Sequence, residues 1–454
     1  MKTVPFFQRE VSRITAAYRL LFALAFFWPI TLFAQFQNHL LSKEPDAGRS
    51  VVDWNNQFVL LQQVDFGRMN TDLVLSRLDA TGKILPGGVR LGTEKGEFPR
   101  YLQKVVNKEN KPDGFIIVGE TNFAGASGTT DLFLIRTNQA GEALWTRRYG
   151  NPTTTETGVC VIQLPDKGFA AVGLSKEANK TGVYVVRTDY DGNPLWNRVF
   201  FDESGFAQGS FLEFLPNISR GGLYVVGTAR MNSKASDVLL MNLDPQKGDV
   251  VWANRYWHGD AMSESGLCIR QVKMPKAPGL AITGTINGTD EFTFVVGSGG
   301  APVWGNRYAV PESRLNPVGV VPADAEGKNL LVAGTFLKGR EKVAFYHRVN
   351  ASNGNHDVCQ TYRWDTASIV LHDLKATFRE GFSSIGFYQG TNDTYVLHTN
   401  QTLMTPKNCP PQKVEVKVTP GVKQTAVKMT IQNRDASGWQ VMQSKFEQKE
   451  RRCY

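Results

Sequence analysis

Acidic residues recur along this chain at a regular interval, and they are the first candidates for chemistry. Each lies in a connection ahead of an apolar run, at Glu97, Glu156, Glu203, Glu264, Glu312 and Asp365. Carboxylates gathered in one ring would hold a cation or attract a basic ligand. Alternatively, each carboxylate accepts backbone N–H bonds and fixes its own turn. Repetition favours the turn, because a binding site is usually asymmetric.

A second acidic pattern, formed by Asp189, Asp191 and Asn193, is similar to the start of a calcium-binding loop. It lacks the other ligands and the terminal Glu that such a loop requires. Comparable segments at 79–82 and 138–141 keep only the residues of a hairpin turn. We therefore expect a turn here, and no metal site.

Residues that commonly carry out catalysis are scattered. The chain has 6 His residues, none of them paired with another His or a Cys at metal-ligand spacing, and it has no Gly-x-Ser-x-Gly elbow. We expect no catalytic residue, no metal and no cofactor. A glycan-cleaving site stays open, since its two carboxylates can lie far apart in sequence.

The elements that must position these residues form a repeat of about fifty residues, present seven times. Its copies align on the second glycine of Gly-x-x-x-x-Gly, which is replaced by Gln62 in the first copy and is otherwise Gly119, Gly173, Gly227, Gly284, Gly334 and Gly386. A polar or acidic residue that opens an apolar run follows in every copy. Four copies end in Trp-x-x-x-Tyr or Trp-x-x-x-Phe, at Trp145, Trp196, Trp252 and Trp304.

Within one copy, residues 157–201 contain four short β-branched and aromatic runs separated by turn residues. One four-stranded antiparallel sheet is only marginally stable alone, so the seven sheets must pack on each other. This pattern predicts an all-β fold, a seven-bladed β-propeller spanning residues 35–409. Whether residues 36–42 complete the last blade stays open at this point.

The repeat resembles a group of secreted bacterial propellers best known from Bacteroidota. The matching residues are Gly114 to Gly119, Asp131 to Asn138, Gly141 to Trp145 and Tyr149-Gly150. Residues Leu243 to Trp252 are also similar to the tryptophan docking motif of quinoprotein propellers. Both resemblances imply a propeller, and neither implies one activity. Quinone-dependent dehydrogenases carry adjacent cysteines, which this chain lacks.

Two connections break the repeat, and packing alone does not explain their residues. They contain Trp257, His258, Asp260 and Glu264 after the fourth copy, and Arg363, Trp364 and Asp365 after the sixth. Exposed aromatic side chains beside charges suit a contact with a protein or a glycan. Burial over the rim of the channel is the alternative, and the sequence favours it.

The N-terminal 34 residues have the composition of a secretion signal. Four basic residues precede an apolar stretch that ends at Ala34, so we expect cleavage after Ala34 and export to the periplasm or cell surface. An uncleaved membrane anchor is the alternative, and no later segment is apolar enough to span a bilayer. Of the net charge of +9, the signal holds +3 and residues 410–454 hold +5, which leaves +1 for the propeller. Nucleic acid is therefore not an expected partner.

The 5 Cys residues allow at most two bridges. Cys160 and Cys268 occupy equivalent apolar runs and are expected to be buried as small hydrophobic residues. Cys359 and Cys409 are candidates for a disulfide between neighbouring blades. Cys453 would be left over.

The last segment, residues 410–454, forms a basic extension with three alternating runs at 414–418, 425–431 and 438–442. These runs bury too little surface to fold alone, so they pack on the propeller flank or add to a partner's sheet. We expect a non-catalytic interaction platform in an envelope or surface assembly, with the extension contacting a second subunit. A glycan-binding or carbohydrate-active propeller using Trp257, Trp364 and the acidic connections is the alternative.

Overall fold

The computed structural model describes residues 35–40, 44–67, 70–122, 128–216, 218, 221–230, 235–274, 277–363, 367–377, 381–404, 411–426, 429–433 and 447–450. The expected secretion signal lies outside these residues. Residues Gln35–Tyr454 form one compact unit. In the described part of the chain the regular elements are all strands, and no helix there is long and apolar enough to cross a membrane.

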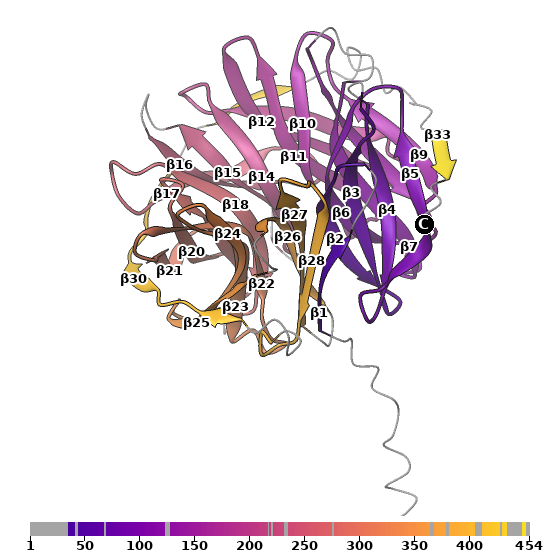
Figure 1. The fold of residues 1–454 in the computed structure, drawn as a ribbon. Coiled ribbons are helices and arrows are strands. Elements are labelled where there is room, and N and C mark those ends of the chain that lie inside the picture. The colour runs from indigo at the N-terminus through magenta and orange to yellow at the C-terminus, as the bar shows by residue number, and fades with distance from the viewer. Residues whose placement is uncertain are drawn as a thin grey trace, which may run out of the picture. The chain divides into compact units, whose positions relative to one another are not determined.

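Seven antiparallel sheets make up this unit, which confirms the predicted seven-bladed β-propeller (Figure 1). Each blade has four strands, as follows. Blade 1 contains β2 (Asp46–Trp54), β3 (Gln57–Asp65), β4 (Thr71–Asp79) and β5 (Ile84–Gly92). Blade 2 contains β6 (Glu97–Val106), β7 (Pro112–Thr121), β8 (Asp131–Thr137) and β9 (Ala143–Tyr149). Blade 3 contains β10 (Thr155–Gln163), β11 (Phe169–Glu177), β12 (Lys180–Thr188) and β13 (Pro194–Phe201).

Blade 4 contains β14 (Ala207–Phe214), β15 (Leu223–Arg230), β16 (Ser236–Leu243) and β17 (Val250–Trp257). Blade 5 contains β18 (Glu264–Val272), β19 (Gly279–Ile286), β20 (Asp290–Gly297) and β21 (Pro302–Ala309). Blade 6 contains β22 (Ser313–Pro322), β23 (Asn329–Lys338), β24 (Glu341–Asn350) and β25 (His356–Tyr362). Blade 7 contains β26 (Ser368–Thr377), β27 (Gly381–Gln389), β28 (Thr394–Thr399) and, from the other end of the chain, β1 (Phe36–Leu40).

Strand β1 closes the ring as the outer strand of blade 7, where it pairs with β28 (Figure 1). The inner strands of blades 1 and 7, β2 and β26, also contact each other, which completes the circle. The Ser50 hydroxyl donates to Asp373 across this junction, 2.5 Å from its Oδ2. Residues 36–40 therefore supply the outer strand that the seventh copy lacks in its own sequence.

Every inner strand has a β-bulge at the same place. The register shifts after Gly48, Pro99, Gly158, Gly209, Gly266, Pro317 and Leu371. In blades 2 to 7 the repeat glycine lies opposite this bulge. A Cβ on Gly173, for example, would overlap the carbonyl oxygen of Thr157. The repeat glycine is thus required by the close approach of two backbones.

The Trp-x-x-x-Tyr or Trp-x-x-x-Phe motif connects each of blades 2 to 5 to the blade that follows it. Trp304 donates from its indole N–H to the carbonyl of Ala351, 2.8 Å away, and its ring lies against Gly354 in a turn of blade 6. Tyr308 donates to the Gly354 carbonyl at 2.6 Å. Gly354 has a φ of 71°, which a residue with a side chain adopts only with strain.

Strand β1 repeats this contact at the ring junction. Phe36 lies against Gly82 of blade 1 where a Trp lies in blades 2 to 5, and the Asn38 amide donates to the Gly82 carbonyl. Asn306 makes the matching bond to Gly354 at 2.9 Å in blade 5. Phe36 and Asn38 of β1 therefore take the roles of Trp304 and Asn306 in the outer strand of the repeat.

In its described residues, the C-terminal extension adds a fifth strand to five blades. We call these strands the C-terminal belt, and they are β29 (Gln412–Lys413) on blade 6, β30 (Lys417–Pro420) on blade 5, β31 (Lys423–Ala426) on blade 4, β32 (Thr430–Asn433) on blade 3 and β33 (Glu447–Glu450) on blade 1. Each pairs antiparallel with an outer strand, and β30 and β33 lie at the periphery in Figure 1.

Packing on the propeller flank is therefore confirmed, whereas the expected boundaries of the extension strands were wrong. The described part contains short strands of two to four residues in place of the longer runs at 414–418 and 425–431. The belt passes from one blade to the next, so it can pair with each outer strand only briefly. The third expected run, 438–442, lies outside the described residues.

The hydrophobic core lies between the blades. The largest cluster runs from blade 2 to blade 6, and smaller clusters join blade 6 to blade 7 and blade 1 to blade 2. Val414, Val416, Val418 and Val422 of the extension pack against the largest cluster. Cys160 and Cys268 are buried with free thiols, which confirms the expectation for both.

Candidate functional site

The acidic connections are turn-fixing groups wherever their carboxylates are buried. Glu97 accepts from the backbone N–H of Thr93 at 2.8 Å and from the Thr121 hydroxyl at 3.0 Å. Glu156 accepts from the backbone N–H of Asn151 at 3.3 Å, and Glu264 accepts from the backbone N–H of His258 at 2.6 Å. All three are fully buried. The turn interpretation is therefore confirmed for these three residues.

The remaining acidic connections do not complete a ring. Glu203 and Glu312 are exposed, and in the Glu203 turn it is the buried Asp202 that accepts from the N–H of Phe206, at 3.1 Å. Asp365 lies outside the described residues. Burial raises the pKa of Glu97 and Glu156, and the hydrogen bonds to hydroxyl and N–H groups oppose that rise.

The connection after blade 4 contacts the chain's own C-terminal belt. Trp257 is half-buried, and its indole donates to Asp260 at 3.0 Å. Asp260 is exposed and also forms an ion pair with Lys423 of β31 at 3.0 Å. Trp257 faces Lys423 in the register of β17 with β31. These two sequence candidates therefore contact the protein itself.

The other two candidates of this connection form a buried pair. The His258 ring lies 3.1 Å from the Glu264 carboxylate through Nδ1 and is tilted on Phe292, with 5.4 Å between ring centres. In the second connection, Arg363 is exposed and pairs with Glu341 of its own blade, while its carbonyl accepts from Gln37 of β1 at 2.9 Å. Trp364 and Asp365 lie outside the described residues.

The calcium-like segment is a hairpin turn. Asp189 Oδ1 accepts from the backbone N–H of Asp191 at 2.9 Å and of Asn193 at 2.8 Å, which is an Asx turn. Among the described residues, no group of three or more His, Cys, Asp or Glu could hold a metal ion. Cys359 is buried with a free thiol, and its expected partner Cys409 lies outside the described residues.

The residues at the β-bulges of the inner strands form a basic cluster on one side of the propeller axis. Arg49, Arg100 and His372 are the bulge residues of blades 1, 2 and 7, while blades 3 to 6 have Val159, Ser210, Leu267 and Val318. Arg49 lies 3.3 Å from the His372 ring and donates to Gln63 at 2.7 Å. Burial, together with the like charge of Arg100, lowers the pKa of Arg49 to about 10.

Further along the inner strands, side chains from four blades meet across the axis. Tyr101 of blade 2 accepts from Arg270 of blade 5 at 3.1 Å, and Arg270 lies 4.2 Å from the centre of the Phe211 ring of blade 4. Lys375 of blade 7 lies 3.5 Å from the centre of the Tyr101 ring. We call these four residues the axial cluster. They fill the centre of the propeller at this level.

Two carboxylates balance the axial cluster. Asp373 lies 3.2 Å from the Lys375 ammonium, and Glu213 lies 3.8 Å from the Arg270 guanidinium. Burial lowers the pKa of Lys375 to about 8 against the opposing effect of Asp373, and burial raises the pKa of Glu213. Sequence reasoning missed this cluster. The available signal was a basic residue within an apolar inner-strand run, after Ile269 and after Leu374.

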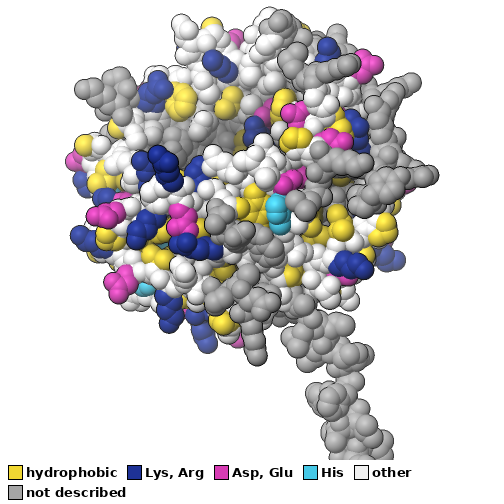
Figure 2. Space-filling model, in the orientation of Figure 1, with side chains coloured by type: hydrophobic (Ala, Val, Ile, Leu, Met, Phe, Trp, Pro, Cys, Tyr) yellow, Lys and Arg dark blue, Asp and Glu magenta, His cyan; other side chains and the backbone are white. Residues whose placement is uncertain are grey.

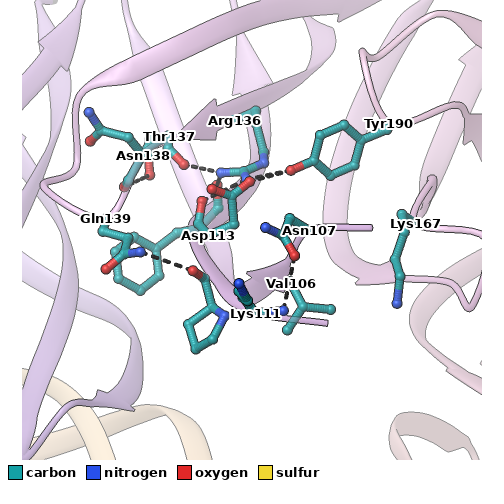
Figure 3. A network of polar contacts seen from close by, with 12 residues as sticks. Val106, Asn107, Lys111, Asp113, Arg136, Thr137, Asn138, Gln139, Lys167 and Tyr190 are labelled. Atoms are coloured by element: carbon teal, nitrogen blue, oxygen red, sulfur yellow. Dashed lines mark hydrogen bonds and ion pairs between the residues drawn. The ribbon is translucent and has the colours of Figure 1, made fainter. Parts of the chain in front are cut away.

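A polar network joins blades 2 and 3 (Figure 3). Arg136, almost fully buried, donates to the Asp113 carboxylate at 2.6 Å and to the Tyr190 hydroxyl at 3.1 Å. Tyr190, in a turn of blade 3, donates to the same carboxylate, so Asp113 lies between the two. Arg187 and Asp166 form the equivalent pair one blade further. Repetition of the pair indicates a structural role.

A hydrogen-bonded chain of one glutamate and two histidines lies between blades 5 and 6. Glu291 and His347 are both fully buried, and His347 Nδ1 lies 2.9 Å from the Glu291 carboxylate. His347 Nε2 lies 3.1 Å from Nδ1 of the more exposed His356. Burial, followed by the neighbouring His347, lowers the pKa of His356. The two rings and one carboxylate connect the interior to the surface.

The described fold and these contacts define the chain as a seven-bladed β-propeller with a five-strand belt. No family model and no curated protein matches the sequence. Among solved structures, the chain is similar to Sqt1 from Chaetomium thermophilum, with 10% identity, a TM-score of 0.48, and coverage of 81% of this chain and 98% of that one. It is also similar to fructan 1-exohydrolase IIa from Cichorium intybus, with 8% identity, a TM-score of 0.30, and coverage of 87% and 98%.

Proposed function

We propose that this chain is a non-catalytic, exported β-propeller that serves as an interaction platform in a cell-envelope or cell-surface assembly. The observation that carries the proposal is that the charged side chains that could do chemistry are already bonded within the protein. The acidic residues that could have formed a reactive ring at Glu97, Glu156 and Glu264 are buried and bonded within their own turns. The charged groups of the axial cluster, Arg270 and Lys375, are likewise paired with the carboxylates of Glu213 and Asp373.

Rigidity supports the same proposal. The N-terminal strand closes blade 7 and the belt joins blades 6, 5, 4, 3 and 1, so both ends of the compact unit are fixed to the ring. A platform of this kind binds without paying for large rearrangements. Figure 2 shows basic and acidic side chains interspersed over the face it presents, which suits protein contacts better than nucleic acid.

The belt changes how a second subunit would engage. Its described strands already pair with the protein's own blades, so a partner would contact the outer side of the belt instead of receiving a donated strand. Export is supported by the composition of residues 1–34, with basic residues ahead of an apolar stretch.

Affinity purification of the tagged chain from native envelopes, after mild cross-linking, tests the proposal. The expected result is one or a few protein partners recovered in fixed ratio with the chain, with cross-links to exposed residues of the propeller or belt. A chain that is recovered alone from every fraction would refute it. The glycan alternative through Trp257 has less support, because Trp257 and Asp260 bond each other and Asp260 bonds the belt.

A further inference from the structure

Most blades pair an acidic residue near the start of the third strand with a basic residue on the outer strand. Asp131 and Arg148 lie 3.0 Å apart in blade 2, and Asp393 and His39 lie 3.0 Å apart in blade 7. Blades 1 and 5 have the same arrangement, with the pairs Asp72–Arg90 and Asp290–Arg307. Blade 6 has a shifted pair, in which Glu341 contacts Arg363 directly after the outer strand. The pair is therefore part of the repeat.

Blade 4 has both residues of this pair but does not form it. Arg255 donates to Asp202 at 2.7 Å and to the carbonyl of Arg230 at 3.2 Å. Asp237, which is the expected acidic partner, is buried, and its Oδ2 has no hydrogen bond to any residue that the structure describes. Burial raises the pKa of Asp237 to about 6, although the nearby charge of Arg255 opposes the rise. Blade 4 therefore contains both residues of the pair without forming the pair.

A pocket of about 320 Å³ opens beside this place, between blades 4 and 5. Its lining is almost entirely polar and includes Gln208, Thr228, Arg230, Ser236 and Ser265. Three of these five side chains are hydroxyls, which both donate and accept hydrogen bonds. The volume lies at the lower end of the range for small-molecule sites. A ligand of about one ring would fill it.

Thr228 supplies an unused polar group to this pocket. Thr228 is 3% exposed, and its hydroxyl has no hydrogen-bond partner among the described residues. The equivalent residue in blade 6, Thr335, accepts from the backbone N–H of Leu371 in the next blade at 3.0 Å. A buried hydroxyl without a partner is costly unless a ligand satisfies it. Thr228 therefore differs from its repeat equivalent in the way a binding residue would.

Arg230 gives the pocket its charge. Its side chain is exposed, and the guanidinium lies 4.6 Å from the centre of the Phe206 ring, which orients it at the pocket wall. A guanidinium in this position can bind a carboxylate with two parallel hydrogen bonds. Asp237 follows Ser236 directly, and its negative charge would oppose a doubly charged anion such as phosphate. A ligand with several hydroxyl groups and one negative charge suits these surroundings best.

We propose that the pocket between blades 4 and 5 binds one acidic sugar unit of a glycan. Thr228, Ser236, Ser265 and Gln208 bond the hydroxyl groups of the sugar, and Arg230 bonds its carboxylate. This site goes beyond the proposed platform function, since a propeller that holds a protein partner could also bind an acidic glycan of the envelope. It does not include Trp257, and it borders the connection of Glu264, whose carbonyl accepts from the Ser236 hydroxyl at 3.1 Å.

The test is titration of the full chain with galacturonic acid, followed by saturation-transfer NMR, with galactose as the matched neutral sugar. Wild-type protein should bind galacturonic acid in preference to galactose. Thr228→Val keeps the shape of the side chain and removes only the unused hydroxyl, so it should weaken binding about five-fold and leave the thermal stability unchanged or slightly higher. Arg230→Gln should remove the preference for the acidic sugar.

Thr335→Val is the matched control, because it removes the equivalent hydroxyl of blade 6 and should lower stability without changing binding. Failure of wild-type protein to bind galacturonic acid would overturn the proposal, as would equal binding of galactose. An equal loss of binding in Thr228→Val and Thr335→Val would also overturn it. A partner recovered from native envelopes bears on the platform proposal alone, so the two proposals can fail separately.

Discussion

Replacing Gly354 by Ala would test whether the Trp motif holds neighbouring blades together. Gly354 has a φ of 71°, and a Cβ placed on it would lie 2.5 Å from the Trp304 ring and from the Asn306 amide nitrogen. The left-handed backbone alone costs a residue with a side chain about 1–2 kcal/mol. Forcing the Trp304 ring aside adds about 1–3 kcal/mol. The expected total is about 2–5 kcal/mol.

Gly339→Ala is the matched control, because Gly339 has a φ of 59° and a Cβ added to it would meet no atom within 4 Å. It should therefore cost only the backbone strain, about 1–2 kcal/mol. Unfolding entropy of about 2 cal/mol/K per residue makes 1 kcal/mol worth about 1 °C in Tm for a domain of roughly 400 residues. Differential scanning calorimetry should thus show Gly354→Ala melting clearly below Gly339→Ala.

A double-mutant cycle separates the two costs. In a Trp304→Ala background, the ring that Gly354 accommodates is absent, so Gly354→Ala should cost less than it does in the wild-type background, and the remaining cost comes from backbone strain and the Asn306 amide. The coupling between positions 304 and 354 should be about 1–3 kcal/mol. Equal melting of the two single variants, or no coupling in the cycle, would refute the assignment of Trp304 as a contact between blades.

Three further outcomes follow from the structure. Gly305 contacts Val422 of the extension, so Gly305→Val should displace Val422, and limited proteolysis should then cut the belt before the propeller. Gly299→Val is the control, because a side chain at Gly299 would enter open space and should leave the belt protected. Burial lowers the pKa of His398 from 6.5 to about 4, so the unfolded chain takes up the proton first and the free energy of unfolding falls, by at most about 3 kcal/mol, as the pH drops from 6.5 toward 4. In His398→Leu, the urea midpoint should depend less on pH over that interval. The same pH dependence in the variant as in the wild type would count against this prediction. Burial raises the pKa of Asp237 to about 6, so the folded chain binds the carboxyl proton of Asp237 more tightly than the unfolded chain does. Asp237→Asn removes the buried charge and should therefore raise the Tm at pH 8 but not below about pH 4. A lower Tm at pH 8 would contradict this prediction.

The repeat allowed the architecture to be predicted because each copy carries its own turns and alternation. The glycines marked the second strand, and the Trp residues marked the outer strand. The contribution of β1 could not be settled in the same way. Phe36 and Asn38 match Trp304 and Asn306 only in the role that they play against the next blade, and that role becomes visible when the ring is closed.

The candidate sites were predictable only in part, for a physical reason. Turn-fixing carboxylates act within a few residues of themselves, so Glu97 and Glu156 could be interpreted locally. The axial cluster joins Tyr101 to Arg270 across the ring, and the pocket depends on whether Arg255 turns toward Asp202 or Asp237. These contacts join side chains from different blades, so they cannot be predicted from the sequence of a single copy of the repeat.

The most direct test of the proposed function is cross-linking of the tagged chain in intact envelopes, followed by purification and mass spectrometry. The platform proposal predicts a complex larger than the 50.4 kDa chain, with a partner in fixed ratio and cross-links on the propeller or the outer side of the belt. Recovery of the chain only as a free monomer, in every fraction and at every cross-linker concentration, would contradict it.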